Sequence, residues 1–231
     1  MKINKLHSWD MTPKEAVALQ QELRDRVSQV TPAGFKANLI AASDISYNRF
    51  SSHFHAAVVV VSMPEMEIVE ISTAEGDVSF PYVPGLLSFR EMPVIQLAYE
   101  SLESTPDVVL MDGHGLSHPR RMGVACHAGL FLDIPTIGCA KSLLAGEYVE
   151  PRKMRGSYTD IVIDGEITGS ALRTRDGVKP IYVSVGHKID LKTARNLVLS
   201  LSCGLRIPMP LREAHNKANE LRRLFNLKKV N

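Results

Sequence analysis

An alternation of short apolar runs and helix-like segments in the middle third of the chain restricts the fold most strongly. Residues 108–111 and 135–140 are apolar runs of strand length, whereas residues 87–102 and 122–132 have the apolar spacing or small-residue content of helices. Strands that alternate with helices are typical of parallel pairing in an α/β sheet. The middle of the chain therefore predicts parallel strands covered by helices.

The first third of the chain predicts antiparallel strands instead. A helix is expected from the capping box Thr12-Pro-Lys-Glu15 to about residue 29, and strand-like runs follow at 37–47, 54–63 and 66–73. The last two runs are separated only by Met63-Pro-Glu-Met66, which favours a hairpin. Together with the middle third, these strands predict a mixed central sheet flanked by helices.

The last third of the chain continues the mixed pattern with less regular spacing. Strands are expected at 161–163, 167–173 and 181–185, and helices at 191–203 and 210–225. No internal repeat, low-complexity stretch or long polar linker marks a boundary, so residues 1–231 are expected to form a single domain.

Composition indicates a globular protein without membrane or disulfide features. The 231 residues are 45% hydrophobic and 23% charged, and no apolar run is long enough to span a bilayer. The N-terminus has no signal-peptide pattern, so a cytoplasmic location is expected. The odd, widely spaced cysteines Cys126, Cys139 and Cys203 are interpreted as reduced core thiols.

Charge is distributed unevenly along the chain. Residues 1–140 contain 10 Lys/Arg and 16 Asp/Glu, whereas residues 141–231 contain 17 and 9. An acidic first part and a basic second part suit a metal site beside a surface that binds a polyanion. Chance clustering of solvated charges explains the same numbers, and the distribution alone does not decide between the two.

Three carboxylates are candidates for a metal site. Asp44 interrupts the apolar run Leu39–Ile45, and Asp112 ends the apolar run before Gly113. A buried carboxylate needs a partner or a cation. Either aspartate alone is better explained as a turn cap or an ordinary strand end. Both together with Glu91 favour an all-oxygen site, which suits magnesium or manganese.

The helix that carries Glu91 has an uncertain start. Pro93 lies two residues after Glu91, so the helix either begins near Met92, with the proline in its first turn, or kinks at the proline. The direction of the Glu91 side chain therefore stays open at this stage.

Several residues near Asp112 have the chemistry of anion binding. The glycines of Asp112-Gly-His-Gly expose backbone N–H groups, and His118-Pro-Arg-Arg121 precedes a predicted helix. Lys141 follows the next strand and can contact a phosphate at the same sheet end. A single lysine is more often a surface residue, and His215 on the last helix reads by default as a surface histidine.

Tyr82 lies in a stiff loop between Pro81 and Pro84. A rigid exposed aromatic can wedge into a base stack or fill the space of a displaced base. Without further information, packing of the tyrosine against its own loop is the better explanation.

Four ordered motifs give the chain a resemblance to a known family over nearly its whole length. They are Ala42-Ser-Asp-Ile-Ser-Tyr47, Phe80-Pro-Tyr-Val-Pro-Gly-Leu-Leu-Ser-Phe-Arg-Glu91, Val109-Leu-Met-Asp-Gly-His-Gly-Leu-Ser-His-Pro-Arg-Arg121 and Pro135-Thr-Ile-Gly-Cys-Ala-Lys-Ser142. In these motifs the chain resembles the endonuclease V family of deoxyinosine 3′ endonucleases, which have a ribonuclease-H-like fold.

The resemblance implies a role for each candidate residue. Asp44 and Asp112 are expected to be the principal Mg²⁺ ligands, with Glu91 completing the acidic cluster and Mn²⁺ able to substitute. Tyr82 is expected to be the wedge at the lesion. Gly85, Gly113 and Gly115 are expected to form the pocket for the flipped base. His118 and Lys141 are expected to contact the substrate near the reacting phosphate. His215 lies at a position where some members of the family have Asp.

The activity implied by the resemblance is cleavage of DNA containing deoxyinosine at the second phosphodiester bond 3′ to the lesion, with 3′-hydroxyl and 5′-phosphate products. A pocket donor at the hypoxanthine oxygen would reject the amine of adenine. A monomer is expected. Two alternatives stay open from the sequence: an endoribonuclease acting on inosine-containing RNA, and a non-catalytic binder of structured nucleic acid, against which the intact carboxylates argue.

Overall fold

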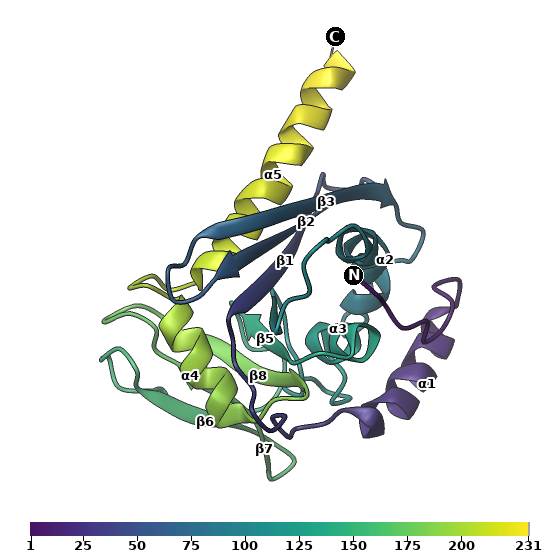
Figure 1. Ribbon diagram of the computed structural model, residues 1–231. Helices are drawn as coiled ribbons and strands as arrows, with labels where there is room; N and C mark the ends of the chain where they lie inside the picture. The colour runs from purple at the N-terminus through teal and green to yellow at the C-terminus, as the bar shows by residue number, and fades with distance from the viewer. Residues whose placement is uncertain (231) are drawn as a thin grey trace.

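The computed structural model describes residues 1–230, and its eight strands form one sheet in the order β3-β2-β1-β4-β5-β8-β7-β6 (Figure 1). The strands are β1 (Leu39–Tyr47), β2 (His53–Ser62), β3 (Ile68–Asp77), β4 (Val108–Met111), β5 (Thr136–Ala140), β6 (Tyr158–Ile163), β7 (Glu166–Leu172) and β8 (Ile181–His187). The helices are α1 (Pro13–Leu23), which continues into a 3-10 turn at Arg24–Arg26, α2 (Leu87–Glu100), α3 (Val124–Leu132), α4 (Leu191–Leu201) and α5 (Met209–Val230).

The sheet is mixed, as the sequence predicted. β1, β2 and β3 form an antiparallel meander, β1 pairs in parallel with β4 and β4 with β5, and the remaining pairs are antiparallel. The central parallel strands β4 and β5 are buried at every position, because helices cover both of their faces. Parallel strands that end at the same edge create a shared edge for side chains that follow them.

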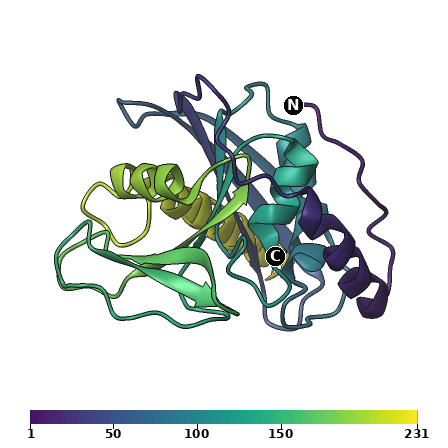
Figure 2. The same cartoon turned by 90° about the horizontal axis from the view of Figure 1, so that it is seen from below.

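Helices lie on both faces of the sheet, and each face has its own apolar cluster. α2 and α3 lie on one side of the sheet, α2 against β1, β2 and β3 and α3 against β4, β5 and β8, in the cluster that contains Phe54, Phe89 and Tyr99. α4 and α5 lie on the other side, where Leu201 and Leu211 are buried. Both views show α5 running along the back of β1 and β2, on the side away from α2 and α3 (Figures 1 and 2). The two sides of β1 thus face different helices, which decides the surroundings of each of its side chains.

Helix α2 starts earlier than Met92, which was the start expected in one of the two alternatives from the sequence. It begins at Leu87 and contains Pro93 in its interior, so the expectation of a start near Met92 was wrong. A proline inside a helix removes one backbone hydrogen bond. Burial of Phe89, Met92 and Tyr99 on the sheet offsets that loss and keeps the preceding turn helical.

Two other expectations need correction. Cys126 and Cys139 are buried free thiols as predicted, but Cys203 is exposed and therefore is not a core thiol. It lies just beyond the end of α4 in a turn with a positive φ, before the chain enters α5. Helix α5 itself extends beyond the predicted limit of residue 225. Across the described residues, we find no helix with the length and apolarity required to cross a membrane.

Candidate active site

Neighbouring parallel strands bring Asp44 and Asp112 to one end of the sheet. Ser43 of β1 pairs with Met111 of β4, and each aspartate is the next residue along its strand. Their side chains are largely buried, with 14% of Asp44 and 19% of Asp112 exposed. The apolar strands hold the backbone in place, so the register alone fixes the two carboxylates beside each other.

Glu91 approaches the same place from helix α2. In the part of the chain that the structure describes, its carboxylate makes no hydrogen bond or ion pair. Burial, and then the charges of Asp44 and Asp112, raise the pKa of Glu91 to about 8. Burial and the charge of Asp112 also raise the pKa of Asp44. The three carboxylates are therefore close enough to repel one another when ionised.

Two basic side chains contact these aspartates. His215 of α5 donates from Nδ1 to Asp44 Oδ2 at 2.6 Å, and its Nε2 accepts from Asn219 at 3.0 Å. These partners assign the proton of a neutral His215 to Nδ1. Lys141, just beyond β5, donates from Nζ to Asp112 Oδ2. His215 thus belongs to the acidic cluster, although its sequence context was that of an ordinary surface helix.

The residues of this cluster fit a divalent cation by donor chemistry and charge. Carboxylate oxygens are the ligands that Mg²⁺ and Mn²⁺ prefer, and a dication would relieve the repulsion that raises the pKa of Glu91. The ligand atoms of the acidic cluster are not as close together as in a compact metal site. Among the described residues, three potential ligand atoms within 4.8 Å of one another are found at His53, His55 and Glu75, outside this cluster.

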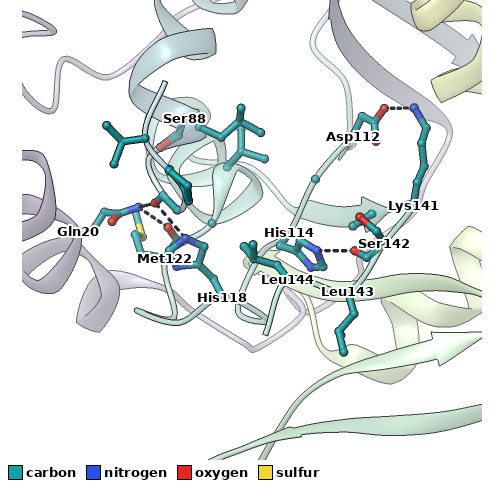
Figure 3. Close-up of a pocket in the computed structure, with 18 of the residues that line it drawn as sticks. Gln20, Ser88, Asp112, His114, His118, Met122, Lys141, Ser142, Leu143 and Leu144 are labelled. Carbon is teal, nitrogen blue, oxygen red and sulfur yellow. Dashed lines mark hydrogen bonds and ion pairs between the residues drawn. The ribbon is translucent and has the colours of Figure 1, made fainter. Parts of the chain in front are cut away.

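A cavity of about 380 Å³ opens directly beside the acidic cluster. Asp112 and Lys141 line one end of it, and the loop from Tyr82 to Gly85 lines another part of its wall. Figure 3 shows the Asp112–Lys141 pair at one side of the pocket, His118 and Gln20 at the other, and His114 between them. Tyr82 is 66% exposed, so it does not pack against its own loop.

The carbonyl of Gly85 is the anchor of the Tyr82 loop. It accepts from Gln20 Nε2 at 3.0 Å, from His118 Nε2 at 3.0 Å and from Arg120 Nη2 at 2.8 Å. Gly85 has a φ of +80°, and a Cβ there would lie 2.6 Å from Arg120 Nη2. A glycine is favoured at this position because L side chains rarely adopt this backbone conformation, and a Cβ would also displace the Arg120 guanidinium from the Gly85 carbonyl.

His118 supports this loop from inside the protein. Only 3% of the residue is exposed, and its Nδ1 accepts from the backbone N–H of Arg120 at 3.1 Å. Burial, and then the Arg120 charge, lower the pKa of His118 to about 4, so the ring is neutral with its proton on Nε2. His118 borders the cavity while both ring nitrogens are engaged within the protein.

The two glycines after Asp112 have different surroundings. Gly113 lines the cavity, and a Cβ there would lie 2.5 Å from Val124 Cγ1. Gly115 is buried outside the cavity lining, where a Cβ would lie 1.9 Å from the carbonyl oxygen of Val185 on β8. The first glycine gives space at the pocket, and the second allows the loop to pack on the neighbouring strand.

His114 is a pocket residue that sequence reasoning missed. Its Nε2 donates to the carbonyl of Ser142 at 2.9 Å, and burial lowers its pKa. Its Nδ1 is buried and has no hydrogen-bond partner among the described residues. The signal was present in the sequence, because His114 lies between two glycines directly after the strand that ends at Asp112. Gln20 of α1 was also missed, since nothing local links it to the Gly85 loop.

Comparison with known proteins identifies the family. Residues 21–216 match the family model described as Endonuclease V. The chain is 52% identical to endonuclease V of Dehalococcoides mccartyi over 96% of this chain and 99% of that protein. It superimposes on the crystal structure of Bacillus subtilis endonuclease V with a TM-score of 0.93 and 37% identity, covering 99% of this chain and 100% of that one.

A more distant structural relative has been solved with nucleic acid. Endonuclease V of Ciona intestinalis, in complex with a 24mer DNA containing an inosine followed by a ribo-adenosine, has a TM-score of 0.79 and 28% identity, with coverage of 94% of this chain and 98% of that one. These likenesses confirm the predicted ribonuclease-H-like fold class. The chain belongs to the endonuclease V family of nucleases, which hydrolyse phosphodiester bonds.

Proposed function

We propose that this protein is a metal-dependent DNA repair endonuclease that recognises deoxyinosine and cleaves the second phosphodiester bond on its 3′ side. The products would carry a 3′-hydroxyl and a 5′-phosphate. One observation carries the proposal: the acidic cluster and the adjoining cavity share two residues. Asp112 and Lys141 contact each other in the cluster and also line the wall of the cavity. A base in that cavity and a phosphate near the cluster would belong to the same strand.

Recognition is assigned to the cavity and its loop. An exposed Tyr82 is able to fill the space left by a displaced base, because base–aromatic stacking contributes about 1–3 kcal/mol per base. Gly85 and Gly113 give the base access to backbone groups, and His118 holds the loop through the Gly85 carbonyl. Gly115 would act indirectly by setting the position of the Asp112 loop against β8.

The reaction is assigned to the acidic cluster. Asp44, Glu91 and Asp112 would hold Mg²⁺, and Mn²⁺ would be able to replace it. The ion would supply a nucleophilic water and charge stabilisation. Lys141 places an ammonium group where it can neutralise charge on the phosphate. His215 orients the Asp44 carboxylate and is in turn oriented by Asn219.

Charge on the rest of the molecule supports binding of a polyanion. The second part of the chain, with 17 Lys/Arg against 9 Asp/Glu, forms β6, β7, β8, α4 and α5. Phosphate contacts from such residues supply affinity without reading sequence. We further propose that residues 1–231 act as one domain, that the protein is a monomer, and that it works in the cytoplasm.

The test is cleavage of an oligonucleotide that contains one deoxyinosine, with Mg²⁺ present. Asp44→Asn and Asp112→Asn should each reduce the cleavage rate by at least about 100-fold, since each removes a charge from the proposed metal site. Asp107→Asn is a control, because Asp107 instead accepts from the backbone of Asn38 and Leu39. Normal cleavage by either site variant, or cleavage of an adenine substrate at the same rate, would contradict the proposal.

A second candidate substrate is inosine-containing RNA. The Ciona complex contains a ribo-adenosine directly after the inosine, so a ribose is accommodated at that position in a relative. Discrimination between DNA and RNA depends on contacts to the 2′-hydroxyl of one nucleotide. Cleavage rates on matched substrates that differ only in that sugar would decide which nucleic acid is preferred.

A further inference from the structure

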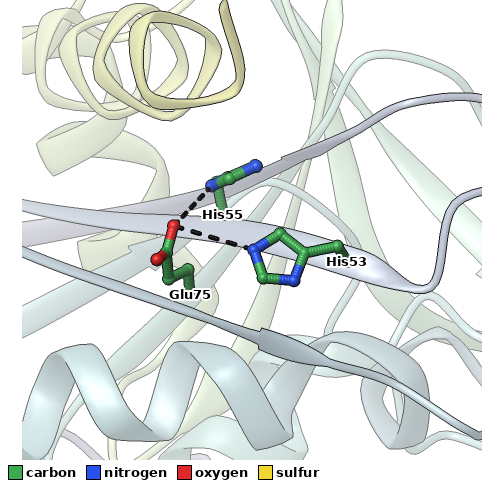
Figure 4. Close-up of side chains that lie close together, drawn as sticks. All are labelled: His53, His55 and Glu75. Carbon is green, nitrogen blue, oxygen red and sulfur yellow. Dashed lines mark ion pairs between the residues drawn. The ribbon is translucent and has the colours of Figure 1, made fainter. Parts of the chain in front are cut away.

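Two histidines and a glutamate meet on the sheet away from the cavity. His53 and His55 lie two residues apart on β2, so their side chains point to the same face of the sheet. The antiparallel register places His55 opposite Glu75 of β3. Figure 4 shows both imidazoles directed at one carboxylate oxygen of Glu75. His53 Nε2 lies 3.7 Å from that oxygen and His55 Nδ1 lies 3.4 Å from it.

The two distances to Glu75 are close to those between ligands of one ion. The three ligand atoms all lie within 4.8 Å of one another. Donor atoms bound tetrahedrally at about 2.0–2.1 Å lie about 3.3–3.5 Å apart, so both measured distances are close to those of a ligand set. A hydrogen bond from an imidazole N–H to a carboxylate would be expected at or below about 2.9 Å, and both measured distances are longer.

The protonation of His53 also matches a metal ligand. Asp77 Oδ1 lies 3.2 Å from His53 Nδ1 and accepts its proton, which leaves the lone pair of Nε2 facing Glu75. That Nε2 is buried and has no hydrogen-bond partner among the described residues. A carboxylate behind a histidine is the usual arrangement that fixes ring orientation at zinc sites.

We propose that His53, His55 and Glu75 bind a divalent transition-metal ion of the zinc class, at a site separate from the acidic cluster. Two imidazoles and a carboxylate are typical zinc donors, whereas Mg²⁺ prefers oxygen ligands and binds imidazole nitrogens poorly. His55 is 1% exposed and anchors the site, whereas 64% of the Glu75 side chain is exposed, which gives the ion a path from solvent.

Charges around the site favour a dication. Glu75 and Asp77 contribute two negative charges, and Arg222 of α5 opposes them with one positive charge that lowers the pKa of His55. The side chains of Glu75, Asp77 and Arg222 therefore leave a net negative charge around the site. This negative charge attracts a dication to the site.

The position of the site connects it to helix α5. Phe225 stacks on His53 with ring centroids 4.4 Å apart, and it meets His55 edge-on at 5.1 Å. His215, which contacts Asp44, lies about three turns earlier on the same helix. An ion that fixes the two imidazoles would stabilise the surface on which α5 packs, so its expected role is structural.

Calorimetric titration of Zn²⁺ into metal-free protein tests the site. The titration is done in an Asp44→Asn/Asp112→Asn background, which removes two carboxylates from the acidic cluster. One equivalent should bind, and millimolar Mg²⁺ should not displace it. Thermal unfolding is the second measurement, because an ion that binds only the folded state raises the melting temperature.

Substitutions locate the bound ion. Glu75→Gln and His53→Gln should abolish the Zn²⁺-dependent rise in melting temperature, and Asp77→Asn should weaken Zn²⁺ binding by about 10–100-fold. Glu67→Gln is the matched control, because Glu67 is an exposed glutamate immediately before β3. This variant should bind Zn²⁺ as strongly as the background protein does. Absence of Zn²⁺ binding in the background, or unchanged binding in Glu75→Gln and His53→Gln, would overturn the proposal.

Discussion

At the scale of single residues, Glu91 is the group whose ionisation depends most on the fold. The pKa of Glu91 is about 8 in the folded protein, against an ordinary value of 4.5. When a folded-state pKa is raised, the stability associated with the neutral form is complete below the unfolded pKa and is lost as pH rises through the folded pKa. In metal-free protein, the contribution of Glu91 to stability should therefore be lost between about pH 4.5 and pH 8.

Glu91→Gln should remove this part of the pH dependence, because glutamine cannot ionise. At pH 8 with a chelator present, the variant should exceed the parent in free energy of unfolding by up to about 4 kcal/mol, and the two should converge near pH 4.5. Urea unfolding across this range measures the difference. Glu103→Gln, at an exposed position, should follow the parent. Parallel curves for Glu91→Gln and the parent would contradict the assignment.

At the scale of elements, the loop from Phe80 to Gly85 is positioned by side chains from distant parts of the chain. Its aromatic tip is free, while its end is held by Gln20 of α1 and by His118 and Arg120 beyond β4. Rigidity at the base and exposure at the tip suit a residue that enters a nucleic acid without first rearranging.

Tyr82→Ala should therefore affect the substrate and leave folding unchanged. The side chain is 66% exposed, so its removal should leave the melting temperature within experimental error of the parent. Binding to a deoxyinosine duplex should weaken by about 1–3 kcal/mol, the contribution of one stacked base. Phe50→Ala, which removes an aromatic 92% exposed elsewhere, should not weaken it. Equal effects of both substitutions would argue against a wedge at Tyr82.

The loop after β4 depends on its contact with β8. A Cβ at Gly115 would lie 1.9 Å from the backbone oxygen of Val185, which cannot move without disturbing the sheet. Gly115→Ala should destabilise the protein by about 3 kcal/mol or more through overpacking. Gly76→Ala is the control, since a Cβ there meets only Val94 Cγ2 at 3.6 Å. Thermal unfolding measures both, and equal stability of the two variants would contradict the proposed packing.

At the scale of the whole molecule, folding and catalysis depend on different interactions. Two apolar clusters, one on each side of the sheet, account for the buried core, and Asp44 and Asp112 lie at the end of its central strands. Removal of divalent ions with a chelator should stop cleavage while the far-ultraviolet circular dichroism and cooperative unfolding remain. Binding of DNA should also persist, because phosphate contacts do not require the ion.

Restoration of activity by Mg²⁺ or Mn²⁺, measured on the same chelated sample, completes this experiment. A chelated protein that cleaves at the original rate would show that the acidic cluster has been assigned the wrong role. Salt should weaken DNA binding steeply, as expected for a surface with an excess of Lys and Arg.

The sequence by itself determined the order of strands and helices and the motifs that carry the family resemblance. Local patterns specify these, because apolar periodicity and turn residues act over a few positions, as in the β2–β3 hairpin and the strand before Asp112. It also identified Asp44, Glu91 and Asp112 as unusual carboxylates, since buried ionised groups need partners.

Only the tertiary structure decided which distant side chains meet. Helix packing placed His215 on Asp44, turned His118 inward to the Gly85 carbonyl, and kept α2 helical on both sides of Pro93. It also gathered His53, His55 and Glu75 into one cluster. These contacts join residues 20 to 171 positions apart, where local sequence carries no information about which partner a polar side chain finds.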